Sequence, residues 1–154
     1  MEYSLNQTKK IGKSEARVSF EPKIMVFTCR WCSYAGADLA GVSRIQYPPQ
    51  VRLIKLMCSG RITPTFILKA FQFGADGVLV TGCHLGECHY ISGNKNAQAQ
   101  IQITEKIVEL LGVEVERLKL EWISASEGAK FARTVEEFTE LIKKMGPSPL
   151  GAAQ

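Results

Sequence analysis

Hydrophobic positions along the chain fall into short runs, the last of which alternates with polar residues, and longer stretches of mixed polarity separate these runs. Each short run is bounded by turn-forming residues and has the length of a buried strand. Each is followed by a stretch that predicts a helix, either from apolar residues three and four positions apart or from a row of small residues. The predicted strands cover residues 23–28, 51–57, 77–81 and 118–123, and the predicted helices cover residues 33–42, 64–73, 95–111 and 134–145.

Local signals mark several helix ends. Thr63 followed by Pro64 is a typical helix start, because threonine caps the helix and proline fits its first turn. Gly74 is the expected end of the same helix, where a residue of left-handed conformation is common. The segment Thr134-Val-Glu-Glu137 has the pattern of a capping box, which predicts that the last helix begins there.

Strand and helix alternate along the chain in the manner of an α/β protein with a parallel sheet. We therefore expect a single open sheet of about four parallel strands with helices on both faces, a flavodoxin-like or Rossmann-like three-layer sandwich. The domain is expected over residues 22–147, between a flexible or partner-bound N-terminal extension (residues 1–21) and a C-terminal tail (residues 148–154). Ligands of such folds bind beyond the carboxyl ends of the strands.

All five cysteines lie at or just past the end of a predicted strand. Cys29 and Cys32 follow the first strand, Cys58 follows the second, and Cys83 and Cys88 follow the third. Because the carboxyl ends of parallel strands meet at one edge of a sheet, we expect the thiols to converge there. The sequence thus predicts a cofactor site at this edge, with the rest of the chain as its scaffold.

Composition narrows the chemistry of that site. The formal net charge is a mild +4, and much of this excess lies in the first stretch of the chain, without the aromatic interleaving of a nucleic-acid patch: Lys9, Lys10, Lys13, Arg17 and Lys23. The sequence shows no apolar run of membrane-spanning length and no signal-peptide pattern, so we expect a cytoplasmic protein that binds neither membrane nor nucleic acid. Structural disulfides are rare in that compartment, and clustered cysteines there more often bind metal or do redox work.

Thiolates bind zinc, copper(I) and iron–sulfur clusters. A fold with a full hydrophobic core does not need a structural zinc ion for its stability. Thiols that come from several strand ends favour a binuclear iron–sulfur cluster, which takes four thiolates. Arg30 and Arg61 follow cysteines at turns, and we expect them to lie near such a cluster and tune its potential by charge. His84 and His89 are interpreted as hydrogen-bonding or surface residues rather than as ligands of a Rieske-type iron.

Two other functions remain open from the residues alone. Cys29 and Cys32 are spaced as the redox pair of a thiol–disulfide oxidoreductase. The cysteines could also hold zinc in an interaction module. A dinucleotide fingerprint, a phosphate-binding loop and a nucleophile–histidine–acid arrangement are all absent from the sequence.

Four segments, in order, resemble the delta subunit of methyl-viologen-reducing hydrogenase, and the resemblance covers roughly residues 22–147. They are Phe27-Thr-Cys-Arg-Trp-Cys32, Met57-Cys-Ser-Gly-Arg61, Thr81-Gly-Cys-His-Leu-Gly-Glu-Cys-His-Tyr90 and Ser124-Ala-Ser-Glu-Gly128.

The resemblance implies a non-catalytic electron-carrier subunit with one [2Fe–2S] cluster. Such a subunit relays electrons from a hydrogenase or a formate dehydrogenase to the flavin subunit of heterodisulfide reductase, in an electron-bifurcating complex of methanogenic metabolism. It also implies that four of five cysteines ligate the cluster, without saying which one is spare: Cys29, Cys32, Cys58, Cys83 and Cys88. Because Cys29 leaves its strand directly, we favour it over Cys32 as a ligand.

Overall fold

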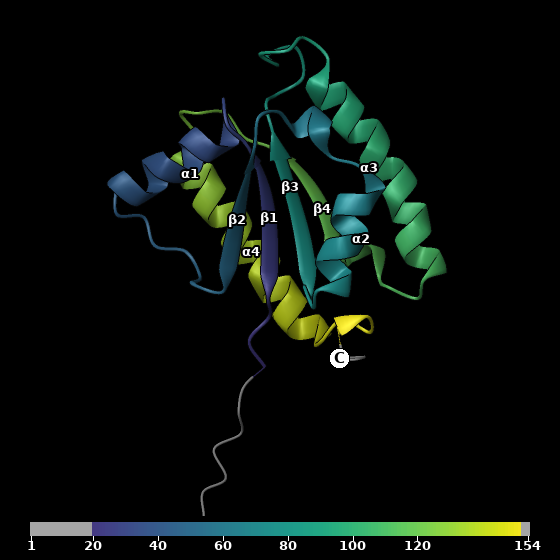
Figure 1. Ribbon diagram of the computed structural model, residues 1–154. Coiled ribbons are helices and arrows are strands. Elements are labelled where there is room, and N and C mark those ends of the chain that lie inside the picture. The colour runs from purple at the N-terminus through teal and green to yellow at the C-terminus, as the bar shows by residue number, and fades with distance from the viewer. Residues whose placement is uncertain (1–19, 152–154) are drawn as a thin grey trace, which may run out of the picture.

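Four parallel strands form the sheet that the hydrophobic pattern predicts (Figure 1). The computed structural model describes residues 20–151, so most of the predicted N-terminal extension and the last three residues lie outside the described part. The strands are β1 (Ile24–Cys29), β2 (Val51–Leu56), β3 (Gly77–Gly82) and β4 (Leu118–Trp122), in the order β2-β1-β3-β4.

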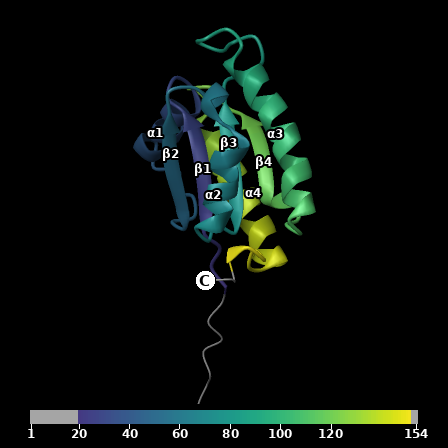
Figure 2. The same cartoon turned by 45° about the vertical axis from the view of Figure 1, so that its right-hand side comes forward.

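Helices cover both faces of the sheet, as expected (Figures 1 and 2). One face carries α1 (Ser33–Val42) and α4 (Gly128–Met145), and the other carries α2 (Pro64–Gln72) and α3 (Gly93–Leu110). Short 3-10 turns, η1 (Ser59–Arg61) and η2 (Val115–Arg117), join the larger elements. The prediction of an open parallel sheet in an α/β sandwich is confirmed.

The core lies in two layers, one on each side of β3, which is buried along its whole length. On the α2 and α3 side, Phe71 and Ile101 pack against strand residues, and on the α4 side Phe131 and Phe138 do the same. Burying each such side chain contributes about 1.5–3 kcal/mol, which is enough to fix the strand register in a domain of this size. β2 lies at the edge and exposes polar residues.

The start of the last helix differs from the prediction. α4 begins at Gly128, and Thr134 of the expected capping box is a buried residue inside the helix. Glu127 directly precedes the first turn, and its carboxylate accepts a hydrogen bond from the Ser124 backbone N–H of the preceding loop, at 2.7 Å, rather than from α4. A side chain at Gly128 would lie 2.8 Å from the Ala40 backbone nitrogen, so small residues here bring α4 close to α1.

Arg117 joins several segments at the end of the sheet where the strands begin, which lies opposite the cysteines. Its side chain is 1% exposed and donates hydrogen bonds to the backbone carbonyls of Asp76, Gly146 and Pro147. The Asp76 carboxylate in turn accepts from the backbone N–H groups of Lys23 and Ser148. These contacts join the start of β1, the start of β3 and the segment that follows α4.

Replacing Arg117 by alanine is expected to lower the free energy of unfolding by about 2–4 kcal/mol, because buried carbonyl groups lose their donors. The exposed Arg52 on β2 offers a matched control, and Arg52→Ala should change the stability by no more than about 0.5 kcal/mol. Urea unfolding followed by circular dichroism measures both variants. Equal losses in the two variants would contradict this role for Arg117.

Candidate metal centre

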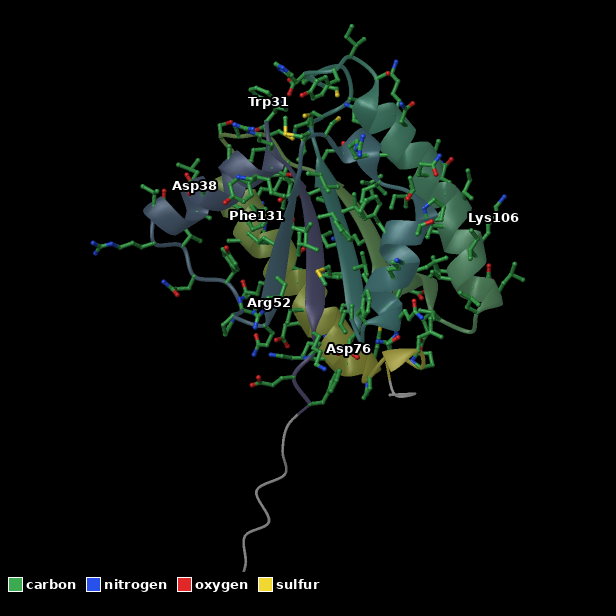
Figure 3. All side chains as sticks on the ribbon, in the orientation of Figure 1. Trp31, Asp38, Arg52, Asp76, Lys106 and Phe131 are labelled. Carbon is green, nitrogen blue, oxygen red and sulfur yellow. The ribbon has the colours of Figure 1, made fainter. Side chains whose placement is uncertain are left out.

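The sheet brings two cysteine sulfurs together at the carboxyl ends of neighbouring strands. Cys29 is the last residue of β1 and Cys83 directly follows β3, and their Sγ atoms lie 3.9 Å apart. Cys32 precedes α1 and completes a buried group in which all three sulfurs lie within 4.8 Å of one another. Figure 3 shows sulfur atoms gathered at this edge of the sheet, near Trp31.

This position follows from the strand order. The chain passes from β1 outward to β2, and then crosses to β3 on the other side of β1. The connections after β1 and β3 therefore leave the sheet in opposite directions, toward α1 on one face and α3 on the other. Such a switch point opens a crevice beyond the strand ends and is the usual ligand site of this fold class.

A second pair of sulfurs lies beside the first group. Cys58 follows β2 and Cys88 lies in the loop between β3 and α3, and their Sγ atoms are 3.9 Å apart. Gly93, the first residue of α3, packs directly against both sulfurs, and a Cβ there would overlap Cys58 Sγ and lie 3.1 Å from Cys88 Sγ. The absence of a side chain at Gly93 therefore makes room for the two thiols.

Backbone contacts join the two groups into one site. The backbone at Ser59, next to Cys58, is close enough to the Cys29 thiol to act on its pKa. The backbone at His89, next to Cys88, acts in the same direction on the pKa of Cys83. The loops that carry the second pair thus wrap around the first group, and all five thiols are buried.

The surroundings of the thiols favour negative charge at two of them, Cys29 and Cys88. Burial alone would raise the pKa of Cys88, but backbone N–H groups of Tyr90, Asn94 and Gly93 outweigh it and lower the pKa. The last two belong to the N-terminus of α3, where the helix dipole is positive. Gly60 donates its N–H to Cys58 Sγ at 3.4 Å. Amide donors of this kind stabilise thiolates and sulfur-ligated metals.

Cys29 and Cys32 differ in proton affinity. A hydrogen bond from Cys32, opposed in part by burial, lowers the pKa of Cys29 to about 5. The same hydrogen bond and burial raise the pKa of Cys32. Burial also raises the pKa values of Cys58 and Cys83.

The spacing of the sulfurs fits a metal with tetrahedral thiolate ligation. A metal–sulfur bond of about 2.3 Å places two thiolates on one tetrahedral metal about 3.8 Å apart. The pairs Cys29–Cys83 and Cys58–Cys88 both have a separation of 3.9 Å. An all-sulfur donor set with backbone N–H donors is typical of iron–sulfur sites. The residues present therefore fit a thiolate-bound cluster.

Neighbouring polar residues fix the loop that carries Cys83. The buried Asn94 side chain donates to the carbonyls of Cys83 and His84, at 3.2 and 2.7 Å. His84 Nε2 donates to Glu127 Oε2 at 2.7 Å. Gly93, Asn94 and Glu127 were not predicted as site residues from the sequence. The segment Ser92-Gly93-Asn94, which resembles a helix cap just after the cysteine loop, could have indicated the first two.

Neither predicted arginine makes a hydrogen bond to a thiol within the described residues. Arg30 Nη1 lies 3.8 Å from Met57 Sδ, and the guanidinium stands over the Trp31 ring at 5.7 Å from its centroid. Arg61 is exposed at the end of η1, and its guanidinium makes no hydrogen bond or ion pair in the part of the chain that the structure describes. Their influence on a cluster potential stays a prediction.

The family of the chain follows from comparison with known proteins. Residues 24–146 match the family model described as methyl-viologen-reducing hydrogenase, delta subunit. The chain belongs to this family. The resemblance found in the cysteine segments is thereby confirmed. In the described part of the chain, no helix combines the length and the apolar character needed to cross a membrane.

Two relatives show that this region occurs in polypeptides of different length. An iron-sulfur subunit of the F420-non-reducing hydrogenase vhc of Methanococcus voltae is 54% identical over 132 residues, which cover 86% of this chain and 92% of that protein. A polypeptide of the ferredoxin/F(420)H(2)-dependent CoB-CoM heterodisulfide reductase of Methanosarcina acetivorans is 46% identical over 137 residues, 89% of this chain but 17% of that protein. The region therefore occurs both as a separate chain and inside a longer polypeptide.

Gly93→Ala is expected to abolish metal binding, since the added methyl group would occupy the space of the Cys58 sulfur. Gly41→Ala is the matched control, because a methyl group on Gly41 of α1 meets no atom within 4 Å. Metal content per chain, measured after anaerobic purification, should fall to background in the first variant and stay at the wild-type level in the second. Full metal content in Gly93→Ala would contradict the described packing.

Glu127 is expected to contribute pH-dependent stability. Hydrogen bonds from the Ser124 backbone and from His84 lower its pKa from 4.5 to about 2. A lowered folded-state pKa means that the carboxylate stabilises the fold above pH 4.5, and that this contribution is lost as the pH falls toward 2.

The variant Glu127→Gln should therefore have a lower melting temperature than the wild type near neutral pH, and the difference should shrink below about pH 4.5. Thermal unfolding at a series of pH values measures it. Glu140→Gln, at an exposed ion pair on α4, serves as the control and should change little at any pH. A constant difference between Glu127→Gln and wild type down to about pH 3 would contradict the assignment.

Proposed function

We propose that this chain is a non-catalytic electron-transfer subunit that carries one [2Fe–2S] cluster at the cysteine edge of its sheet. The observation that carries the proposal is the presence of two sulfur pairs, each 3.9 Å apart, in one buried region. Two pairs supply the four thiolates that a binuclear cluster takes. The names of relatives as iron-sulfur subunits of hydrogenases support the same cofactor.

Cys29, Cys83, Cys58 and Cys88 are the proposed ligands, with Cys32 as the spare thiol. Cys29 and Cys83 are fixed by adjacent strands, which are the most rigid elements near the site. Cys58 and Cys88 are fixed by their common contact with Gly93. Cys32 lies near Cys29 and Cys83 but belongs to neither 3.9 Å pair.

The chain's own residues would support the cluster in three ways. Four thiolates and the core of an oxidised binuclear cluster carry a net charge of about −2, which the backbone groups at Gly60, Ser59, Gly93 and His89 stabilise. Burial of the thiols limits the access of water to the sulfurs. The bound cluster would supply a one-electron carrier, and a rigid sheet edge would hold it with little rearrangement between charge states.

The proposed electron path runs from a hydrogenase, or from a formate dehydrogenase, to the flavin subunit of heterodisulfide reductase in an electron-bifurcating complex of methanogenic metabolism. The relative from Methanococcus voltae, named as part of a hydrogenase, supports the first donor. Two relatives that contain this region inside a longer heterodisulfide reductase polypeptide support a place next to that enzyme.

The two alternative functions, a thiol–disulfide oxidoreductase and a zinc-binding module, fit the structure to different degrees. A thiol–disulfide oxidoreductase needs an accessible thiolate, and although the pKa of Cys29 is lowered to about 5, that residue is only 1% exposed. A zinc module fits the group Cys29, Cys32 and Cys83 equally well by donor type. Zinc gives a colourless protein without inorganic sulfide, so metal and sulfide analysis separates it from the proposed cluster.

A series of single cysteine-to-serine variants tests the ligand set. Serine at Cys29, Cys58, Cys83 or Cys88 should remove most of the iron and the visible absorption, because one iron loses a thiolate. Cys32→Ser is the matched control and should keep both iron and spectrum. Loss of iron in Cys32→Ser, together with retention in any of the other four, would overturn the proposed ligand set.

A further inference from the structure

Large apolar side chains are exposed in the loops that follow β1, β2 and β3, directly around the thiols. Together they form what we term the cysteine-edge patch: Trp31, Met57, Leu85, Tyr90 and Ile91. Contacts connect much of it, since Trp31 Nε1 donates to the Tyr90 hydroxyl at 3.3 Å and Arg30 contacts both Trp31 and Met57. Exposed apolar groups gathered at one place typically mark an interaction surface.

The backbone of Ile91 adds a second observation. Ile91 has φ +70°, a left-handed conformation that a β-branched residue rarely adopts, and its side chain is 86% exposed. The Ile91 N–H donates to the Cys88 carbonyl, so the turn that imposes this conformation is tied to a thiol-bearing residue. Strain of this kind is concentrated at binding and functional sites. The fold thus holds an apolar side chain outward beside the cysteines.

Aromatic rings connect the patch with the buried thiols. The Trp31 and His89 rings are stacked, with centroids 3.9 Å apart and an interplanar angle of 16°. Trp31 precedes Cys32 in sequence, and His89 follows Cys88. Both rings also line an open pocket of about 270 Å³ whose walls include Cys32 and Cys83. A partner seated on the patch would therefore lie against the layer that directly covers the thiols.

Charges around the patch indicate the kind of partner. Arg30, Arg61 and Lys95 are exposed at this edge, with the acidic Glu87 among them, and the half-buried Glu127 carboxylate is paired with His84. A basic rim around an apolar centre fits a protein surface with an apolar centre and acidic residues at its border. The guanidinium groups predicted to tune the cluster are thus placed to meet a partner as well.

A second apolar surface lies elsewhere and lacks these features. It is a pocket of about 410 Å³ along α2 and the middle of β1 and β2, where Ile54, Phe66 and Phe73 are exposed. None of the five cysteines lines it. The cysteine-edge patch is therefore the surface that combines exposed apolar area, backbone strain and proximity to the thiols.

We infer that the cysteine-edge patch is the docking surface for the flavin subunit of heterodisulfide reductase, with Ile91 as an anchor residue and the Trp31–His89 stack at the interface. The inference rests on the proposed function for its choice of partner. It is supported by the relatives in which this region is part of a longer heterodisulfide reductase polypeptide, which keeps the two in constant proximity.

The test compares the affinities of two variants for the purified flavin subunit of heterodisulfide reductase under anaerobic conditions. Ile91→Asn removes the apolar anchor, and asparagine tolerates the left-handed backbone better than isoleucine does. Leu110→Asn is the matched control, since Leu110 is 87% exposed, as Ile91 is, but lies at the far end of α3. Biolayer interferometry measures the dissociation constants, and iron content and visible spectra check that both variants keep the wild-type site.

We expect the dissociation constant to rise about tenfold or more in Ile91→Asn and to stay within about twofold of wild type in Leu110→Asn. Rising salt should weaken wild-type binding, because the rim is charged. Equal affinities for wild type and Ile91→Asn would overturn the docking surface. Loss of binding to a hydrogenase instead, or a change in self-association, would overturn the choice of partner. A wild-type chain without iron would refute the proposed cofactor while leaving the comparison of affinities readable.

Discussion

The parallel pairing of β1 with β3 is the constraint on which the rest of the site depends. This register brings the ends of two strands that are 54 residues apart, Cys29 and Cys83, to a sulfur separation of 3.9 Å. The connections after β1 and β3 leave the sheet toward opposite faces, and Cys58 and Cys88 lie beside the crevice between them. The thiols converge because of the strand order, and loops refine a position that the sheet has already fixed.

The two ends of the parallel strands have different roles. Where the strands begin, the buried Arg117 and Asp76 satisfy backbone groups and join the segment before β1 and the segment after α4 to the core. At the other end, backbone N–H groups and the start of α3 are directed at sulfur atoms. Glycine at position 93 is required there because helix backbone and thiols occupy neighbouring space. Stability and cofactor binding are thus separated along the strands.

The sequence allowed the fold and the convergence of the thiols to be predicted, because both follow from hydrophobic runs that end in cysteine. The beginning of α4 could not be predicted in this way. The Thr134 pattern has the spacing of a capping box, yet the helix already begins at Gly128. The carboxylate of Glu127, just before it, is held by the Ser124 backbone N–H and by His84 from the loop after β3. Gly93 and Asn94 were missed because their roles depend on contacts with thiols and carbonyls outside their own helix.

We propose that four of the five buried thiols ligate a binuclear iron–sulfur cluster. The most direct test is the content of iron and acid-labile sulfide in the anaerobically purified chain, together with the electron paramagnetic resonance spectrum after reduction. We expect about two irons and about two sulfides per chain, and uptake of one electron that gives a paramagnetic reduced state. Zinc in place of iron, or iron without inorganic sulfide, would contradict it.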